Sequence, residues 1–380
     1  MSDARGFPPA EFAARAAAAQ ARMGAAGLDA LLLTTEPEVR YYTGFLTRFW
    51  ESPTRPWFVI LPASGKPVAV IPAIGAALMG RTWVEDIRTW AAPDYRDDGI
   101  GLLSETLRDL GVRRIGLADG IETHARLPRA DLDRLRGLHD IVGDGDITRT
   151  LRAVKSAAEI ARIEAAVAIA GRAFARVGEI ARPGVPLSRV FRDFQRLALE
   201  EGADHVPYLA GGAGPGGYAD VISPATETPL AAGDVLMLDT GLSRDGYFCD
   251  YDRNWSLGPP SAATARAHDR LLEATARGFE AARPGATMAD LHAAMAPLLT
   301  GPDGAPVAGR LGHGLGMQLT EGASVLPFDH TELVPGMVLT LEPSVMVGAD
   351  RLLVHEENIA ITQTGARWLS APATGLAVLE

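Results

Sequence analysis

"LAAGDVLMLD" (230–239) and "LVPGMVLTLE" (333–342) are the two stretches that decide the fold of this 380-residue chain. In each stretch a glycine turn leads into an apolar run that favours a β-strand, and the run ends in a carboxylate, Asp239 in one and Glu342 in the other. Two copies of one pattern predict that the same structural unit is used twice. If the two copies pack about a pseudo-two-fold axis, the two acids face each other.

The segments ahead of these stretches repeat as well. "ARPGVPLSRVFRDF" (181–194) is echoed by "ARPGATMADLHAAM" (282–295), and each predicts a helix end, a tight turn and a new helix. The repeated unit is therefore a helix followed by a strand. Residues 148–184 predict one long helix, in which Ser156 and Glu159 have the spacing of a capping box.

The first 153 residues have a different pattern, in which short apolar runs alternate with helical stretches such as Ala10–Gly27 and Gly101–Leu110. This alternation predicts α/β layering with buried strands. We therefore expect a protein of the α/β (α+β) class with two domains, residues 1–153 and 154–380, and a boundary near Val154. The apolar runs lie at residues 29–34, 57–62, 67–72 and 114–119.

Composition excludes several classes of protein. With 36 Lys and Arg against 47 Asp and Glu, the formal net charge is −11, and no basic run offers a binding surface for nucleic acid. Neither a membrane-length apolar stretch nor a secretory signal pattern occurs, so we expect a soluble cytoplasmic protein without a membrane partner. The single cysteine, Cys249, allows neither an internal disulfide nor a thiolate zinc cluster, so any metal must be held by oxygen and imidazole.

Four acids and one histidine carry the expected chemistry. Each acid lies in or at the end of an apolar, β-prone run, where an isolated ionised carboxylate is costly unless it is paired or binds a metal. The nearest bases, Arg253 and Arg351, are too few to neutralise them. Carboxylates and an imidazole suit two divalent ions, Mn²⁺, Fe²⁺ or Co²⁺ with Zn²⁺ as a further candidate, and a bridging water or hydroxide is then the nucleophile. The five residues are Asp239, Asp250, His313, Glu342 and Glu356.

The order and local context of these residues resemble one family. Asp239 stands in "LMLDTG", Asp250 in "YFCDYD", His313 in "GHGLG", Glu342 in "LEP" and Glu356 in "EENIAIT". This order is similar to that of the metallopeptidase clan M24, which includes methionine aminopeptidase, Xaa-Pro aminopeptidase, prolidase and creatinase. The resemblance implies a creatinase-type N-terminal domain followed by a duplicated "pita-bread" catalytic domain. It also implies that the five residues are the metal ligands, with Asp250 and Glu356 as bridges.

Two positions depart from that family's pattern. Where typical peptidases of the clan have a second histidine directly before a glutamate, this chain has Thr320 before Glu321. A histidine upstream of the first aspartate is replaced by Val221 or a neighbour. In the family these imidazoles help to bind the substrate and to stabilise the tetrahedral intermediate. Their loss brings non-peptide substrates into consideration, such as the substrate of the clan's lyase that cleaves dimethylsulfoniopropionate.

Further residues of the catalytic domain are candidates for contact with substrate. Glu321 is a candidate for substrate contact or proton transfer, and Thr320 stands beside it. His355 directly precedes a ligand, so its side chain points to the opposite face of the strand, either as a buried structural histidine or at the rim of the site. The glycine-rich segment 209–220 favours a flexible site wall, with Tyr218 as a contact.

In the N-terminal domain, "YYTGFLTRFWESPTRPWF" (41–58) collects aromatic and guanidinium groups. It is either a packed loop or a surface that suits a small zwitterion, with Arg48, Trp50 and Arg55 as candidate substrate contacts. Related two-domain proteins often form dimers in which this domain covers the partner's site. The resemblance therefore implies a homodimer in which the domain acts as a lid.

The leading hypothesis is a dinuclear metallohydrolase that cleaves the amide or peptide C–N bond of a small substrate, as an Xaa-Pro dipeptidase or aminopeptidase does. His313 would serve as both ligand and catalytic group, and Glu342 or Glu321 would pass the proton to the leaving nitrogen. One alternative is a lyase or amidohydrolase that acts on a small zwitterionic onium compound. The other is a pita-bread module that only binds, and the complete ligand set argues against it.

Overall fold

A computed structural model describes residues 5–52, 55–299 and 309–380 of the chain. The chain divides into two compact units, Met1–Arg152 and Ala153–Glu380. Within the described ranges, no helix is both long and apolar enough to cross a membrane.

The N-terminal unit is built on one six-stranded sheet with the strand order β4-β3-β2-β1-β5-β6. The predicted apolar runs form its four inner strands, and all four residues of β1 are buried. Leu103 and Leu107 of α4 pack in the same core cluster as residues of these strands. The strands are β1 (Ala30–Leu33), β2 (Phe58–Pro62), β3 (Val68–Pro72), β4 (Asp86–Trp90), β5 (Arg114–Leu117) and β6 (Asp140–Gly143). The helices are α1 (Pro9–Ala26), α2 (Glu36–Thr43), α3 (Ala76–Met79), α4 (Ile100–Asp109), α5 (Arg129–Arg136) and α6 (Ile147–Ala153).

The two outer strands, β4 and β6, were not predicted from the sequence. Their residues are exposed or half-buried, so they lack the apolar run that marks a buried strand. Each pairs in parallel with an apolar neighbour, β4 with β3 and β6 with β5. Pairing with a buried strand, rather than their own composition, places them in the sheet.

The prediction of one helix over residues 148–184 is wrong, because the chain leaves the helical conformation between α6 and α7 (Ala157–Ala175). Ser156 caps α7, accepting a hydrogen bond from the Glu159 N–H (3.2 Å), while the Glu159 carboxylate accepts one from the Ser156 N–H (3.0 Å). Val154 forms an isolated β-bridge with Met337. The capping box therefore marks the start of α7. The β-bridge at Val154 separates α7 from α6.

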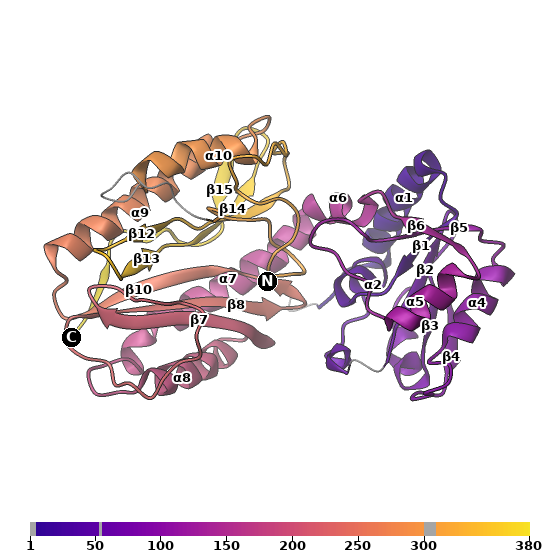
Figure 1. The fold of residues 1–380 in the computed structure, drawn as a ribbon, viewed down its shortest axis with the longest axis horizontal. Coiled ribbons are helices and arrows are strands. Elements are labelled where there is room, and N and C mark those ends of the chain that lie inside the picture. The colour runs from indigo at the N-terminus through magenta and orange to yellow at the C-terminus, as the bar shows by residue number, and fades with distance from the viewer. Residues whose placement is uncertain (1–4, 53–54, 300–308) are drawn as a thin grey trace. The chain divides into compact units, whose positions relative to one another are not determined.

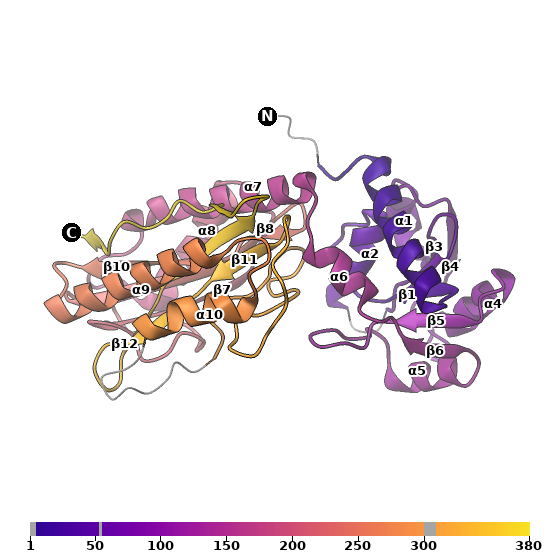
Figure 2. The ribbon, with the colours of Figure 1, turned by 90° about the horizontal axis from the view of Figure 1, so that it is seen from above.

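The C-terminal unit confirms the predicted duplication. Helices α9 and α10 lie on one side of its strands and helices α7 and α8 on the other (Figure 1). Seen from a second direction, strands of this unit lie between α7 on one side and α9 and α10 on the other (Figure 2). The sheets have the orders β16-β10-β8-β7 with β9 paired to β8, β11-β14-β15, and β12-β13. The remaining helices are α8 (Leu187–Glu200), α9 (Ala262–Ala281) and α10 (Met288–Met295). The strands are β7 (His205–Pro215), β8 (Asp234–Arg244), β9 (Tyr247–Phe248), β10 (Tyr251–Leu257), β11 (Val338–Leu341), β12 (Ser344–Met346), β13 (Leu352–Val354), β14 (Glu357–Ile361), β15 (Ala366–Trp368) and β16 (Ala377–Leu379).

The two copies of the repeat share the same backbone hydrogen bonds. In the first copy the Gly184 N–H donates to the Leu230 carbonyl (2.8 Å), and in the second the Gly285 N–H donates to the Leu333 carbonyl (3.1 Å). Leu230 and Leu333 donate in return to Val185 (2.9 Å) and Ala286 (2.7 Å). The Pro-Gly turn ahead of each second helix is thus tied to the turn ahead of each strand. The sequence repeat is a structural repeat.

The expectation of a flexible glycine-rich wall over residues 209–220 is wrong for most of that segment. Residues 209–215 belong to β7, which pairs with β8 in antiparallel orientation. Gly211 has a φ of +144°, and a Cβ there would lie 2.1 Å from the Met237 carbonyl oxygen. The glycine therefore permits close backbone contact between strands rather than mobility.

Candidate metal centre

The five predicted ligands come from the ends of paired strands and from one hairpin in the C-terminal unit. Asp239 lies within β8, and its Cα pairs with that of Asp252 on β10. Asp250 directly precedes β10, Glu342 directly follows β11 and Glu356 directly precedes β14. Antiparallel pairing of β8 with β10 brings Asp239 close to the start of β10, and pairing of β11 with β14 brings Glu342 close to Glu356. We call the set of Asp239, Asp250, His313, Glu342 and Glu356 the ligand cluster.

His313 is placed by a hairpin that is held on both sides. On one side the Leu311 N–H donates to Val325 (2.9 Å), and on the other the Glu342 N–H donates to Leu311 (2.9 Å) and the Thr340 N–H to His313 (2.7 Å). Gly312 makes this possible, because a Cβ there would lie 2.2 Å from the Thr340 carbonyl oxygen. The glycine of "GHG" is thus required by close packing next to the imidazole.

The imidazole of His313 lies between a carbonyl oxygen and a carboxylate. Its Nδ1 lies 3.0 Å from the Gly314 carbonyl oxygen, which can only accept, so Nδ1 carries a proton. Its Nε2 lies 3.3 Å from Asp250 Oδ2. Ligand atoms of Asp250, His313 and Glu356 lie within 4.8 Å of one another. A proton or a metal ion between these acceptors removes their repulsion, and the spacing suits a metal ion.

Three buried oxygen atoms of the ligand cluster have no hydrogen-bond partner: Asp239 Oδ1, Asp250 Oδ1 and Glu356 Oε1. The side chains that carry them are at most 7% exposed. Buried carboxylate oxygens are normally paired, so such orphans point to an ion that supplies the missing interaction. The residues present therefore fit a divalent-metal centre.

The pKa values of the cluster give the same indication. Burial raises the pKa of Asp239 and of Glu356 well above the ordinary value, and the charge of Asp250 raises both further. Burial also raises the pKa of Glu342 to about 7, although this side chain is only half-buried. Without a cation the acids resist ionisation, which is the expected behaviour of crowded ligands.

Three residues near the cluster were not predicted from the sequence. The Tyr208 hydroxyl donates to Asp239 Oδ2 (3.0 Å), and the side chain of Asn358 accepts from the Asp250 N–H (3.1 Å) while its amide donates to the Asp250 carbonyl. The sequence indicates Arg253 and Arg351 as the bases nearest to the acids of the ligand cluster, but Arg310 also acts on these acids. Its charge lowers the pKa of Asp250 and Glu342, which offsets part of the rise that burial causes. Arg310 was visible in "GRLGHG", whereas the other two depend on pairing that the sequence does not show.

A second buried group of charges lies on neighbouring residues, and we call Asp252, Arg253, His355 and Glu357 the histidine cluster. His355 is 2% exposed, with Nδ1 3.6 Å from Asp252 Oδ1 and Nε2 3.3 Å from Glu357 Oε1. Arg253 lies 3.1 Å from the other oxygen of Glu357. Burial alone would raise the pKa of Glu357, but the bond from His355 and the charge of Arg253 lower it. The structure places His355 in this network.

The two residues at the departure from the family pattern have partners in the structure. Glu321 forms a buried ion pair with Lys155 (2.9 Å) and accepts hydrogen bonds from the N–H groups of Met317 (3.1 Å) and Gln318 (3.2 Å). Thr320 is half-buried, and its hydroxyl accepts a hydrogen bond from Arg310 Nη2 (3.0 Å). Glu321 thus binds the backbone of the loop that contains Met317 and Gln318, and Thr320 is hydrogen-bonded to the guanidinium group of Arg310.

Two of the predicted substrate contacts, Tyr218 and Trp50, are buried. Tyr218 is 1% exposed, and its hydroxyl donates to Asn254 Oδ1 (3.1 Å) and accepts from the Val354 N–H (2.6 Å). In the N-terminal unit, Trp50 is buried with its ring 5.8 Å from that of Trp57.

The two arginines predicted as contacts in the N-terminal unit differ in their surroundings. Arg55 lies over the ring of Phe49 (5.0 Å), and Arg48 is exposed beside Glu51 (3.2 Å). Residues 53–54 of this segment lie outside the described part of the chain.

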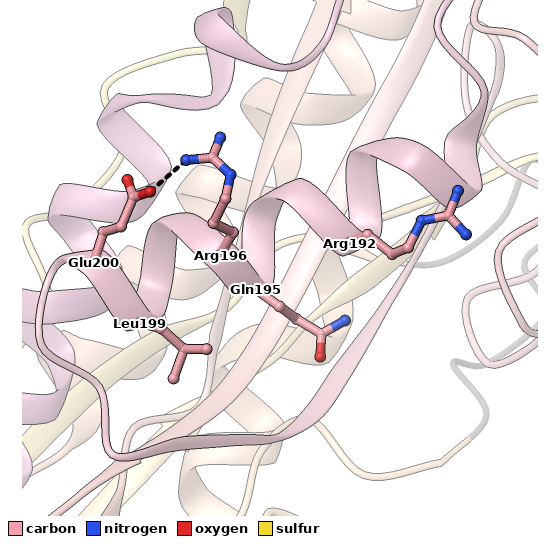
Figure 3. Close-up of a pocket in the computed structure, with 5 residues that line it drawn as sticks. All are labelled: Arg192, Gln195, Arg196, Leu199 and Glu200. Carbon is pink, nitrogen blue, oxygen red and sulfur yellow. Dashed lines mark hydrogen bonds and ion pairs between the residues drawn. The ribbon is translucent and has the colours of Figure 1, made fainter.

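Two pockets lie in the C-terminal unit. One, of about 580 Å³, is lined by residues of α8 alone, Arg192, Gln195, Arg196, Leu199 and Glu200, none of which was predicted to act (Figure 3). The other, of about 630 Å³, is lined by side chains of α7 and β10 and by His268 and His355. Neither lining includes a member of the ligand cluster.

Comparison with known proteins identifies the family. A family model described as metallopeptidase family M24 matches residues 145–364, and one described as creatinase/prolidase N-terminal domain matches residues 15–154. The chain belongs to metallopeptidase family M24. Both the M24 resemblance and the creatinase-type N-terminal domain inferred from the sequence are thereby confirmed.

Of the similar proteins described below, two cover nearly the whole chain and one covers part of it. A protein named probable dipeptidase PepE from Mycobacterium tuberculosis is 30% identical over 95% of this chain and 95% of its own. The Xaa-Pro dipeptidase of Pyrococcus furiosus is 29% identical over 59% of this chain and 65% of its own. Among solved structures, dipeptidase PepE from Mycobacterium ulcerans is 28% identical with a TM-score of 0.82 over 98% of this chain and 99% of its own.

Proposed function

We propose that this M24 protein is a dinuclear metal-dependent dipeptidase that hydrolyses the peptide bond of a small substrate, with Xaa-Pro dipeptides as the first substrates to test. The observation that carries the proposal is the ligand cluster, in which ligand atoms of Asp250, His313 and Glu356 lie within 4.8 Å of one another and three buried carboxylate oxygens have no hydrogen-bond partner. The names of the relatives, probable dipeptidase and Xaa-Pro dipeptidase, support the substrate class.

The five residues of the ligand cluster would hold two divalent ions, and Mn²⁺, Fe²⁺, Co²⁺ and Zn²⁺ all suit this donor set. When bound, such a pair supplies an activated water and polarises the carbonyl group of the substrate. Asp250, His313 and Glu356 would hold an ion together, because one ligand atom of each lies within 4.8 Å of the others. Tyr208 orients Asp239, and Asn358 fixes the backbone of Asp250.

Two glutamates of the chain have further roles, one in proton transfer and one in positioning a loop. Glu342 is the only carboxylate of the ligand cluster that is half-buried rather than buried, so we assign it the proton transfer to the leaving nitrogen. Glu321 is held by Lys155 and two backbone N–H groups, and its role is to position the loop between His313 and Thr320. The cytoplasmic location and the homodimer with a lid stay predictions.

The test is hydrolysis by protein that has been stripped of metal and reloaded with one divalent metal at a time. Xaa-Pro dipeptides, other dipeptides and small onium compounds are offered in parallel, and products are identified by mass spectrometry. Release of two amino acids from a dipeptide supports the proposal. An alkene product from an onium compound, with no dipeptide cleaved, would replace it with the lyase alternative, and tight metal binding without turnover would favour a binding module.

A further inference from the structure

We propose that the pocket of about 630 Å³ lined by α7, β10 and residues 371–375 binds a small carboxylate with an aromatic body. We call it the α7 pocket, and none of its described lining residues belongs to the ligand cluster. The proposal goes beyond the dipeptidase function, and its test does not require peptide hydrolysis.

The walls of the α7 pocket consist of small residues and aromatic rings. Ala168 and Gly171 lie three residues apart, on one face of α7, and leave space beside the helix. Phe174, Tyr251 and Trp255 also line the pocket, and the rings of Tyr251 and Trp255 lie 5.1 Å and 5.8 Å from that of Phe174. Because aromatic rings pack against one another in offset and edge-to-face contacts, these walls favour a flat aromatic ligand.

One buried imidazole of the wall lacks a hydrogen-bond partner among the described residues. His268 of α9 is 2% exposed, and its Nδ1 is sealed from solvent without a partner. Burial, together with the charges of His355 and Arg253, lowers the pKa of His268 to about 4, so at pH 7 the ring is neutral and carries one hydrogen. A hydrogen on the sealed Nδ1 would be an unsatisfied buried donor, so the favoured tautomer carries it on Nε2. Nε2 is not sealed in this way, and it offers an N–H donor to a ligand in the pocket.

The charged groups of the wall favour an anionic acceptor. The guanidinium groups of Arg172 and Arg253 line the pocket, whereas no carboxylate belongs to its described lining. Each guanidinium forms an ion pair with a glutamate outside the lining, Arg172 with Glu201 (2.9 Å) and Arg253 with Glu357 (3.1 Å), so its orientation is fixed before a ligand binds. A carboxylate accepts hydrogen bonds from an imidazole and from a guanidinium, whereas an ammonium group would find no acid in this wall.

The aromatic walls and the donors together select one class of ligand. An apolar aromatic compound without an acceptor would leave the N–H of His268 unsatisfied in the complex. A carboxylate without a ring would leave the aromatic walls uncovered. An aromatic ring that carries a short carboxylate arm satisfies both parts of the pocket.

The experiment measures by calorimetry, at pH 7, the binding of indole-3-acetate and of its neutral analogue indole-3-acetamide to the full chain. Indole-3-acetate is expected to bind with a Kd below about 1 mM and about tenfold more tightly than the amide, since a charge-assisted contact is at stake. Carboxylates also bind metal ions, so both metal-loaded and chelator-stripped proteins are titrated. The two Kd values should agree within about threefold, because the α7 pocket contains no metal ligand.

Three variants test where the ligand binds. Ala168→Phe introduces a ring into the pocket from an exposed position of α7, so it should abolish binding while the protein stays folded. Ala161→Phe is the matched control, at an exposed alanine of the same helix outside the pocket lining, and should leave the Kd unchanged. His268→Phe keeps an aromatic ring but removes the N–H donor, and should weaken the binding of indole-3-acetate about tenfold. Thermal melts establish that each variant is folded, and Ala168→Phe decides alone if His268→Phe is not.

The outcomes support or overturn the proposal without reference to turnover. Binding of the acid that is lost in Ala168→Phe, retained in Ala161→Phe and independent of metal supports it. Absence of saturable binding, binding to the metal-loaded protein alone, or equal binding by wild type and Ala168→Phe overturns it. An amide that binds as tightly as the acid overturns the assignment of a carboxylate ligand. Each of these results leaves the dipeptidase function standing, because that function is measured by hydrolysis at the ligand cluster.

Discussion

The neighbouring acids Glu356 of the ligand cluster and Glu357 of the histidine cluster differ in how their buried charge is compensated. In the histidine cluster, His355 and Arg253 neutralise Glu357 and lower its pKa below the ordinary value. In the ligand cluster, burial and like charges raise the pKa of Glu356, and one of its oxygens has no partner. A buried acid that is paired with bases of the protein stabilises the fold. A buried acid without such partners is suited to bind a cation.

The largest loss of activity is expected from the removal of a metal ligand. Asp250→Ala should lower kcat/KM for a dipeptide by about 10³-fold or more, because the activation of water depends on the metal that Asp250 holds. Steady-state assays of the metal-loaded proteins measure the loss. As a control, Asp204→Ala removes an acid that pairs with Arg244 (3.1 Å), and activity should persist. Activity of Asp250→Ala within tenfold of wild type would contradict the assignment.

The neighbouring pair Glu356 and Glu357 sharpens the comparison. Glu357→Ala removes the carboxylate that His355 and Arg253 share and should lower the free energy of unfolding by about 3–5 kcal/mol, while metal binding persists. Glu356→Ala should abolish metal binding but raise the stability of the metal-free protein, since it removes a repelled charge. Denaturant unfolding and metal analysis of both variants provide the measurement. The distinction fails if both variants lose metal to the same extent.

Removal of the metal should reveal an unusual pH dependence. The raised pKa values of Asp239, Glu356 and Glu342, the last about 7, mean that these carboxyls take up protons on folding of the metal-free protein. Such groups cost stability above their folded pKa, and the cost is relieved as pH falls towards the unfolded value of about 4. Chelator-treated protein should therefore melt higher at about pH 5.5 than at about pH 8, whereas metal-loaded protein should lose affinity for metal on acidification. Thermal melts of both forms test this, and a metal-free protein that is most stable at the higher pH would contradict it.

The smallest effect is expected from the hydrogen bond to Asp239. Tyr208→Phe removes the donor to Asp239 Oδ2 without removing a ligand, so metal affinity should fall by about tenfold at nearly unchanged stoichiometry. Competition with a metal-sensitive dye measures the change. Tyr247→Phe, which removes a buried hydroxyl bonded to Glu159 (2.9 Å), is the matched control and should leave metal affinity unchanged.

The sequence predicted the parts of the fold that local pattern encodes. The repeat, the inner strands of the N-terminal sheet and the family follow from apolar runs, turns and motif order. Strands β4 and β6 were not predicted, because their residues are exposed or half-buried and neither strand has a continuous apolar run. Helix α7 was predicted too long, because the bridge between Val154 and Met337 joins residues far apart in the chain.

In the candidate site, too, local sequence pattern predicted some features, and contacts between distant residues determined the others. Its acids were recognisable because each ends an apolar run, and their meeting follows from the repeat. The contacts of Tyr208 and Asn358 depend on strand register, which the sequence does not display. The ion pair between Glu321 and the buried Lys155 was not predicted, because Lys155 comes from a distant segment of the chain.

The central claim is that the ligand cluster holds two divalent ions, and the most direct measurement is the metal stoichiometry of the full chain. Protein stripped with chelator is titrated with Mn²⁺, Co²⁺ and Zn²⁺, and bound metal per chain is determined by mass spectrometry after gel filtration. The account predicts two ions per chain in the wild type and in Glu357→Ala, and fewer than one in Asp250→Ala. A wild type that retains fewer than two ions per chain at saturating metal, or an Asp250→Ala variant that still retains two, would contradict it.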